Sequence, residues 1–248
     1  INVVTKKPGK NIGSEVSGEA GSFDRYKTRF SFGDEFKNGA SLLVSGSYFD
    51  RQGEKSLYYP EFDDPITNSG IARRRDWDQF QSFFTQFNYQ SFTMDAGYHV
   101  REKGVPTGSF ETVFDHPDNQ TEDLTAFINA RHVHEFSDEL ELTTRLSYGR
   151  YEFNGQYIYE GELPTDPPII PNFDQARGEW IIGETTFRKR FLHKHQAIAG
   201  FEYRYNLQRD QTNCDQSPPF SYLDSRKHGQ VWSPYTTVEL NLSTNLTL

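Results

Sequence analysis

The sequence predicts an all-β protein, an antiparallel up-and-down meander of about ten long strands that forms part of a transmembrane β-barrel. Segments of roughly ten to fourteen residues with alternating apolar and polar side chains recur along the chain. The connections between them are short and long in turn, and aromatic residues gather where segments begin and end. No run approaches the roughly 18 apolar residues of a membrane helix, whereas a β-barrel spans with weaker, alternating strands.

The composition suits a thin sheet with two different faces. Hydrophobic residues make up 34% of the 248 residues, yet aromatic residues alone reach 15%. The net charge of −9 argues against a nucleic-acid-binding protein, because such proteins present a basic face. The single cysteine, Cys214, cannot form an internal disulfide. It is a free thiol or has a partner outside these residues, and its polar neighbours favour the second interpretation.

The first five predicted strands cover 14–22, 25–35, 39–50, 77–88 and 91–102. A short turn at 22–24 separates the first two, and the Asn38-Gly39 pair before the third is a strong hairpin signal. The fourth and fifth strands meet at a tight turn near Tyr89-Gln90. In the fifth strand one face carries apolar side chains and the other carries polar or small ones. The apolar set is Phe92, Met94, Ala96, Tyr98 and Val100.

The last five predicted strands cover 123–135, 139–153, 178–191, 195–207 and 231–245. Tight turns near Ser137-Asp138 and His193-Lys194 join them in pairs. The alternation is clearest here, and it indicates a sheet with one apolar face and one charged face. The apolar sets are Leu140, Leu142, Leu146 and Tyr148 in one strand, and Ala197, Ala199, Phe201, Tyr203 and Tyr205 in another.

The long connections are predicted over 51–76, 103–122, 154–177 and 208–230. Long loops without secondary structure count against a compact soluble domain. They are expected in an outer-membrane barrel, where short turns join the strands at one end and extended loops join them at the other. A soluble jelly roll or sandwich would instead have loops of mixed length at both ends.

Aromatic residues mark both ends of the predicted strands and indicate two membrane girdles. Trp180 and Phe191 are eleven residue steps apart, which at about 3.3 Å each and a tilt near 40° spans roughly 25–28 Å, the height of an outer-membrane apolar band. The alternative is that these side chains only pack strand ends. The girdle candidates are Trp77, Trp180 and Trp232 beside long loops, and Phe36, Tyr89, Phe136 and Phe191 beside tight turns.

The first residues, Ile1-Asn2-Val3-Val4-Thr5-Lys6-Lys7-Pro8, resemble the segment that closes the plug domain of TonB-dependent outer-membrane receptors of the ferric-siderophore type. The stretch 16–26 is similar to the family's first barrel strand and its Gly-Ser-Phe-Asp-x-Tyr turn, whereas 30–36 departs from the family pattern. The resemblance implies that 1–10 are the end of a plug and its linker, and that 11–248 are the N-terminal portion of a 22-stranded barrel. Ten strands would then form an open, incomplete part of it.

The resemblance also implies a function and a set of partners. The expected function is energy-coupled import of a scarce ligand, most readily a ferric siderophore, across the bacterial outer membrane. TonB would bind through a plug N-terminus that this sequence lacks, and outer-membrane lipid and lipopolysaccharide would surround the barrel. Uptake of carbohydrate or cobalamin, a passive porin and a soluble β-sheet binding module are the alternatives. Neither enzymatic activity nor a cofactor is expected.

Candidate ligand-binding residues lie in the long connections. Siderophores that are anionic or flat and aromatic need cationic and aromatic side chains. The tyrosines could instead fold the loop on itself, and the arginines could pair with Glu61, Asp63 and Asp64 or with lipopolysaccharide phosphate. The candidates are Tyr58, Tyr59, Phe62, Arg73, Arg74 and Arg75 in the 51–76 connection, and Tyr157 and Tyr159 in the 154–177 connection.

Two other patterns are discounted. His132 and His134 share a strand face and His193 and His195 flank a turn, but both pairs lie at the end away from the expected ligand, so no metal site is predicted. Glu160 and Glu162 are paired acids on a loop without the apolar setting that glycoside hydrolysis requires, so no catalytic site is predicted.

Overall fold

The structure is a computed structural model that describes residues 13–161, 164, 166–192, 195–243 and 246–247. The motif at Ile1–Pro8, from which the plug domain is expected, lies outside the described residues. His193 and Glu162 also lie outside them.

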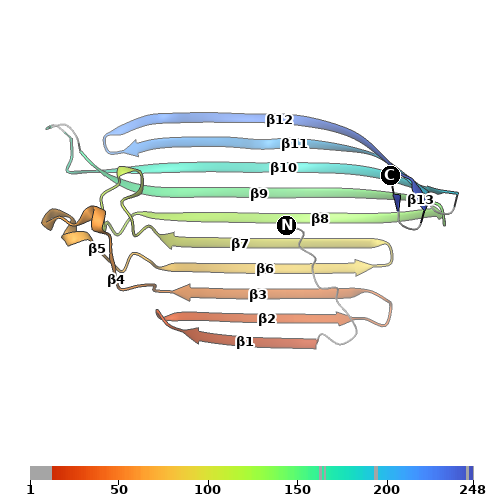
Figure 1. Ribbon diagram of the computed structural model, residues 1–248, viewed down its shortest axis with the longest axis horizontal. Helices are drawn as coiled ribbons and strands as arrows, with labels where there is room; N and C mark the ends of the chain where they lie inside the picture. The colour runs from red at the N-terminus through yellow and green to blue at the C-terminus, as the bar shows by residue number, and fades with distance from the viewer. Residues whose placement is uncertain (1–12, 162–163, 165, 193–194, 244–245, 248) are drawn as a thin grey trace.

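One twisted antiparallel sheet of ten strands dominates the fold, and each strand pairs with the one before it (Figure 1). The predicted fold class, an all-β up-and-down meander, is confirmed. The sheet is open, with β1 and β12 at its two edges. The strands are β1 (Gly13–Gly21), β2 (Arg25–Glu35), β3 (Ser41–Arg51), β6 (Asp78–Tyr89), β7 (Phe92–Gly104), β8 (Gln120–Ser137), β9 (Leu140–Glu160), β10 (Ile169–Phe191), β11 (His195–Gln216) and β12 (Pro219–Glu239).

Two of the four predicted long connections are wrong. β9 and β10 extend through most of 154–177, and β11 and β12 through most of 208–230, so that only 161–168 and 217–218 join them. The last strand also ends earlier than predicted, at Glu239. These extensions carry polar side chains on both faces, and amide pairs such as Gln175 with Asn154 (3.1 Å) support the backbone ladder there. Without hydrophobic alternation they gave no strand signal.

The strand register sorts the side chains of the sheet into two faces. Leu146 on β9 lies opposite Ala130 on β8 and Gly183 on β10. Further across the sheet, Tyr203 on β11 lies opposite Gly183 and Trp232 on β12. We call the side of the sheet that carries these residues the apolar face. Leu146 and Trp232 are each 59% exposed, so no other part of the described protein covers this face. A contiguous apolar surface of this kind indicates contact with lipid or another apolar partner.

The opposite side, the polar face, is held together by ion pairs between neighbouring strands. A representative pair joins the guanidinium of Arg101 on β7 to the carboxylate of Asp78 on β6 at 2.7 Å. Others join β9 to β10 through Arg145 and Glu184 (3.1 Å) and through Arg188 and Glu141 (3.4 Å). These charged residues alternate with apolar residues along each strand, as the sequence pattern predicted.

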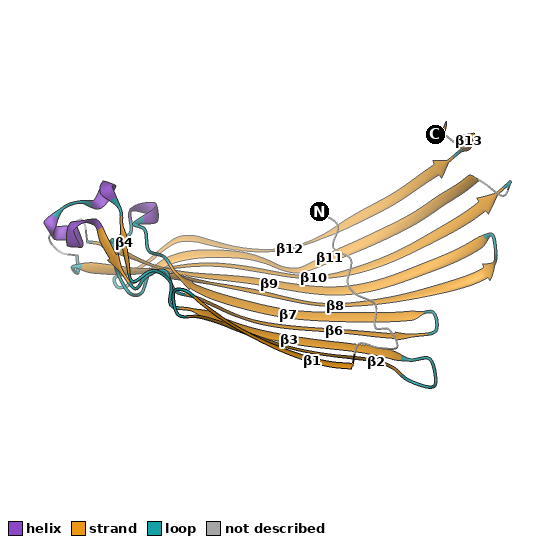
Figure 2. Cartoon of the chain, turned by 60° about the horizontal axis from the view of Figure 1, so that its bottom comes forward, coloured by secondary structure: helices purple, strands orange, loops and turns teal. Residues whose placement is uncertain are grey.

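The remaining elements are short. A two-stranded sheet pairs β4 (Ser56–Tyr58) with β5 (Ile71–Arg73), and a second pairs β13 (Asn241–Ser243) with β14 (Leu246–Thr247). Three 3-10 helices, η1 (Pro60–Phe62), η2 (Pro65–Gly70) and η3 (Ser109–Glu111), lie together at one end of the sheet (Figure 2). Among the described residues, no helix is long and apolar enough to cross a membrane.

Candidate functional site

Two long loops, 52–77 and 105–119, fold together at the end of the sheet where the strand connections are longest (Figure 2). Proline starts both helices of the first loop, since its fixed backbone angle suits a first helical position. Asp64 then caps η2 by accepting the backbone N–H of Ile66 at 2.8 Å. Gly70 ends η2 at a φ of 69°, where an added Cβ would lie 2.5 Å from the carbonyl oxygen of Tyr59. We call this end of the sheet the loop end.

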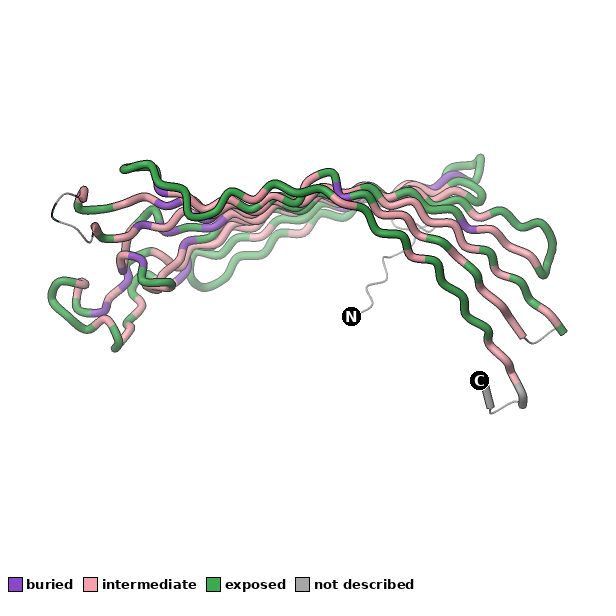
Figure 3. The backbone as a smooth tube through the Cα atoms, turned by 90° about the horizontal axis from the view of Figure 1, so that it is seen from above, coloured by how far each residue is buried: buried purple, intermediate pink, exposed green. Residues whose placement is uncertain are grey.

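The two loops share a small apolar core. Phe114 is 8% exposed, stacks on Phe62 with ring centroids 4.5 Å apart, and meets Tyr59 edge-on at 5.9 Å. Ala72 and Ile158 are almost fully buried at the same end. Of the four buried apolar residues among those described, Ala72, Phe114 and Ile158 lie at this end of the sheet. Many of the buried positions in Figure 3 gather at the same end.

Polar contacts fix the loops to each other and to β9. The carboxylate of Asp115 accepts the backbone N–H of Arg73 at 2.7 Å and forms an ion pair with Arg75 at 3.2 Å. Asn119, 1% exposed, donates to the carbonyl of Val113 and accepts the backbone N–H of Ile158, both at 2.8 Å. Because each contact joins separate segments, the loops form one ordered unit.

An open groove of about 1030 Å³ lies between this loop unit and the polar face of β9 to β12. The loops supply one wall, and the outer ends of the strands supply the floor. Its lining contains four carboxylates, four aromatic rings and two amides, and no lysine, arginine or histidine among the described residues. The lining residues are Phe62, Thr67, Glu111, Thr112, Val113, Phe114, Tyr159, Glu160, Gly161, Asp166, Ile170, Asn172, Asn213, Asp215 and Tyr222.

Asp215 organises the floor of the groove. One carboxylate oxygen accepts the side-chain amide of Asn172 at 2.8 Å, and the other accepts the hydroxyl of Tyr222 at 2.8 Å. Asn172 and Asn213 also exchange amide hydrogen bonds at 3.0 and 3.2 Å. Asn172 and Asp215 are 3% and 8% exposed. The floor is therefore a preorganised polar surface rather than a set of mobile side chains.

These floor residues were not among the predicted site residues, because they lie in segments predicted to be loops. Asn172 and Asp215 face each other only through the register of β10 with β11. Their separation along the chain carries no signal for that pairing. Recognising the polar extensions as strands would have been the one way to find them.

The structure brings only two of the predicted ligand residues, Phe62 and Tyr159, into the groove. Tyr58 is 57% exposed and donates its hydroxyl to Asp63 at 2.9 Å, and this hydrogen bond raises the pKa of Tyr58. Tyr59 packs on the loop core, and burial, followed by the charges of Asp76 and Glu61, raises its pKa. These two tyrosines thus fold the loop on itself.

The predicted arginine cluster Arg73, Arg74 and Arg75 does not line the groove. Arg75 pairs with Asp115 of the neighbouring loop rather than with the acids expected from the sequence. Arg73 and Arg74 are exposed at and just after the end of β5.

Tyr157 and Tyr159 lie in β9 rather than in a loop, which corrects the prediction. The side chain of Tyr157 meets Phe110 edge-on at 6.1 Å.

Trp180 is not on the same face as the other girdle candidates. It lies inside β10 on the polar face, where the guanidinium of Arg204 sits 4.9 Å from its ring centroid. Eleven is an odd number of residues, so in a regular strand Trp180 and Phe191 point to opposite faces. Trp232 does lie on the apolar face, and its ring centroid is 4.4 Å from that of Tyr203. It lies inside β12, however, and not at the point where a long loop enters a strand.

The remaining girdle candidates lie at strand ends, as predicted. Trp77 directly precedes β6 and packs against Gly104, whose added Cβ would be 2.7 Å from the indole nitrogen. The others, Phe36, Tyr89, Phe136 and Phe191, stand beside the tight turns.

His132 and His134 stack with centroids 6.4 Å apart, and His134 packs on Phe136. Within the described ranges no group of three or more His, Cys, Asp or Glu is placed to hold a metal. Cys214 is a half-buried free thiol in β11.

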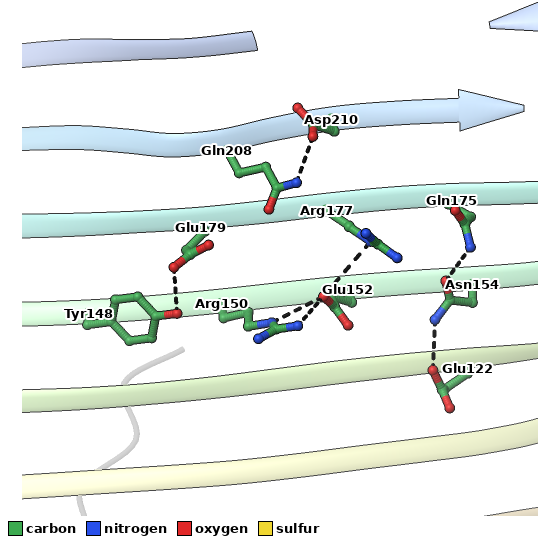
Figure 4. A network of polar contacts seen from close by, with 10 residues as sticks. All are labelled: Glu122, Tyr148, Arg150, Glu152, Asn154, Gln175, Arg177, Glu179, Gln208 and Asp210. Atoms are coloured by element: carbon green, nitrogen blue, oxygen red, sulfur yellow. Dashed lines mark hydrogen bonds and ion pairs between the residues drawn. The ribbon is translucent and has the colours of Figure 1, made fainter. Parts of the chain in front are cut away.

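Towards the loop end, the apolar face gives way to a belt of paired polar side chains (Figure 4). The hydroxyl of Tyr148 donates to Glu179 at 2.8 Å, and Glu152 is shared by Arg150 and Arg177. We call this set the polar belt; it also contains Glu122, Asn154, Gln175, Gln208 and Asp210. The belt crosses β8 to β11 and marks where the apolar surface ends.

No protein-family model and no curated protein sequence matches the chain. Solved structures of outer-membrane receptors do match its fold. The ferripyoverdine receptor of the outer membrane of Pseudomonas aeruginosa, bound to ferripyoverdine, is similar over 98% of this chain and 36% of the receptor, with a TM-score of 0.64 and 12% identity. The pyoverdine receptor FpvA from P. aeruginosa PAO1, bound to pyoverdine, has a TM-score of 0.69 at 12% identity over 98% of this chain and 40% of its own. The structure of FpvAI in complex with pyocin S2 is similar over 98% of this chain and 36% of its own, with a TM-score of 0.64 and 12% identity.

At 12% identity this likeness establishes the fold alone. The predicted resemblance to outer-membrane receptors is confirmed at the level of the fold, because the structural neighbours are receptors of the outer membrane. The chain spans about two fifths of the length of these receptors or less.

Proposed function

We propose that this chain is part of an outer-membrane receptor that imports a ferric siderophore with energy delivered by TonB. Residues 1–10 would be the end of its plug, and 11–248 the first part of a 22-stranded barrel. The observation that carries the proposal is the groove. It lies on the polar face, which becomes the lumen of a closed barrel, and the ordered loop unit covers it at the end expected to face outward.

The two faces of the sheet support insertion in the outer membrane. From His195 to Tyr205, ten steps of about 3.4 Å tilted by about 40° cover roughly 26 Å, close to the height of an apolar barrel band. Phe191 and Trp232 would then belong to the two interfacial girdles, with Trp180 inside the lumen. The polar belt would lie at the level of the outer head groups, where lipopolysaccharide sugars and phosphates are its partners.

Carbohydrate uptake by the same mechanism is the second candidate. Its support is the combination of aromatic rings with Asn172, Asn213 and Asp215, because sugar hydroxyls bind amide and carboxylate groups while sugar rings stack on aromatic faces. A plug-free porin would need no such preorganised floor. Cobalamin uptake has no specific support among the groove residues.

Transport by the full-length receptor tests the proposal. The gene is expressed in a host that lacks its own ferric siderophore receptors, and uptake of radioactive iron from a panel of ferric chelates is measured with and without TonB. We expect saturable, TonB-dependent uptake of at least one chelate. Iron uptake that is unchanged by the receptor, together with TonB-dependent uptake of a labelled oligosaccharide, would replace the first candidate by the second. TonB-independent uptake would refute both.

A further inference from the structure

We infer that the groove selects a cargo with a positively charged group, such as a ferric chelate that carries a primary amine or guanidinium, over an anionic chelate. This inference rests on the proposed function and adds the charge class of the cargo. It reverses the expectation from the sequence, which looked for arginines around an anionic ligand. The reason is where the structure places the charges.

Acidic groups reach the groove from three separate elements. Glu111 comes from η3, Glu160 from the end of β9, and Asp215 from β11. The side-chain carboxylates of Glu111 and Glu160 form no hydrogen bond or ion pair with any described residue. Asp215 accepts two hydrogen bonds from neutral groups and forms no ion pair among the described residues, so its negative charge is positioned but not neutralised. The groove therefore carries an uncompensated negative potential.

The nearby arginines do not compensate this potential. Arg75 forms an ion pair with Asp115, and neither residue lines the groove; Arg73 and Arg74 are exposed and also lie outside the lining. A concave surface lined by one sign of charge concentrates ions of the opposite sign and repels like charge. An anionic chelate would meet carboxylates here with no basic partner on the described walls.

The uncharged walls suit the same ligand. The rings of Phe62, Phe114, Tyr159 and Tyr222 line the groove beside the carboxylates. Aromatic faces attract ammonium and guanidinium groups through cation–π interactions. The volume of about 1030 Å³ is at the upper end of small-ligand pockets, so the groove has room for a metal chelate with a pendant cationic chain.

The test compares three ferric complexes that differ at one terminus, which carries a positive, a neutral or a negative group. A linear trihydroxamate with a terminal primary amine gives a cationic iron(III) complex; acetylation of the amine makes it neutral, and succinylation makes it anionic. Binding to the purified full-length receptor is measured by quenching of intrinsic fluorescence at low and high salt. Because exposed charge pairs contribute modestly, we expect affinity to fall about two- to fivefold at each step from cation to anion. The differences should shrink in high salt.

Two substitutions connect this preference to the groove. The double variant Glu111→Gln with Glu160→Gln should reduce or abolish the preference for the amine complex and leave the acetylated complex within twofold. Glu61→Gln is the matched control, because Glu61 is an exposed acid of the same loop unit that does not line the groove. It should change none of the three affinities.

Equal affinity for the three complexes, a preference for the anion, or binding of none of them overturns the inference. TonB-dependent uptake of iron from any other chelate would leave the proposed function standing in each of these cases. Loss of all TonB-dependent iron uptake removes the proposed function itself, so the two failures are distinguishable.

Discussion

Replacing Phe114 by alanine should open the loop unit without unfolding the sheet. Phe114 is 8% exposed and contributes the central ring between Phe62 and Tyr59. Truncating a buried phenylalanine costs about 3–5 kcal/mol through lost apolar transfer and the remaining cavity. Both of its ring partners belong to the 52–77 loop, so we expect the loss to appear in the local opening of 52–77 and 105–119 rather than in global unfolding.

A loss of about 3–5 kcal/mol raises the population of the open loop unit roughly a hundredfold to several thousandfold. Hydrogen exchange of the full-length receptor in detergent measures this change. The amides of Val113 and Arg73 should lose protection, because the hydrogen bond of Val113 to Ile158 (2.7 Å) joins the second loop to β9 and that of Arg73 to Asp115 (2.7 Å) joins the two loops. Trypsin cleavage at the exposed Arg74 should accelerate in parallel.

Phe110→Ala is the matched control for this experiment. Phe110 belongs to the same loop but is 76% exposed, and its ring meets that of Tyr157 edge-on with centroids 6.1 Å apart. It should leave both amides protected. If Phe114→Ala also leaves their protection and the cleavage rate unchanged, the loops are not held by this aromatic core and the reasoning fails. Lost protection along β9 and β10 as well would show that the loop unit and the sheet unfold together.

Three further predictions concern the sheet and the pH response. Leu146→Arg, on the apolar face, should lower the free energy of unfolding by about 2–4 kcal/mol in folding titrations in lipid vesicles. Ser147→Arg, on the polar face, should lower it by about 1 kcal/mol or less. Equal losses would contradict the assignment of the two faces. Gly149→Val should lower the yield of folded protein because its Cβ would lie 2.4 Å from the ring of Trp180, while Gly183→Ala, with no atom within 4 Å, should fold normally. Burial raises the pKa of Tyr59, because the buried site favours the neutral phenol over the phenolate. The neutral Tyr59 side chain therefore stabilises the loops fully below the ordinary tyrosine pKa of about 10. This stabilisation is lost as the pH rises through the raised pKa of Tyr59 in the folded loops. Ultraviolet titration of tyrosinate should therefore lose a late-titrating component in Tyr59→Phe, and an unchanged curve would refute that origin.

Hydrophobic alternation predicted every strand whose two faces meet different surroundings. The segments 91–102 and 139–153 show the period of two directly, and they also predicted which side chains share the apolar face. The turn residues at 22–24 and 37–39 located the hairpins, because those positions need the backbone conformations that short loops require. These are local properties, and a single sequence contains them.

Where both faces of a strand are polar, the sequence had no such signal. The outer parts of β9 to β12 extend because cross-strand hydrogen bonds, such as those between Asn172 and Asp215, replace hydrophobic contrast. For Trp180, the distance to Phe191 along the strand fits a girdle, but the odd number of steps between them places its side chain on the polar face.

By itself, the sequence determined the meander, the two faces of its alternating strands and the short turns that join those alternating strands, because each depends on neighbours within a few residues. The short turn at 217–218 joins two polar strand ends and was not predicted. The tertiary structure alone decided the groove. Phe62, Phe114, Tyr159 and Asp215 come from four segments far apart in the chain, and only strand register and loop packing bring them together. Register also decided which charges compensate one another, and so which charge the groove presents to a ligand.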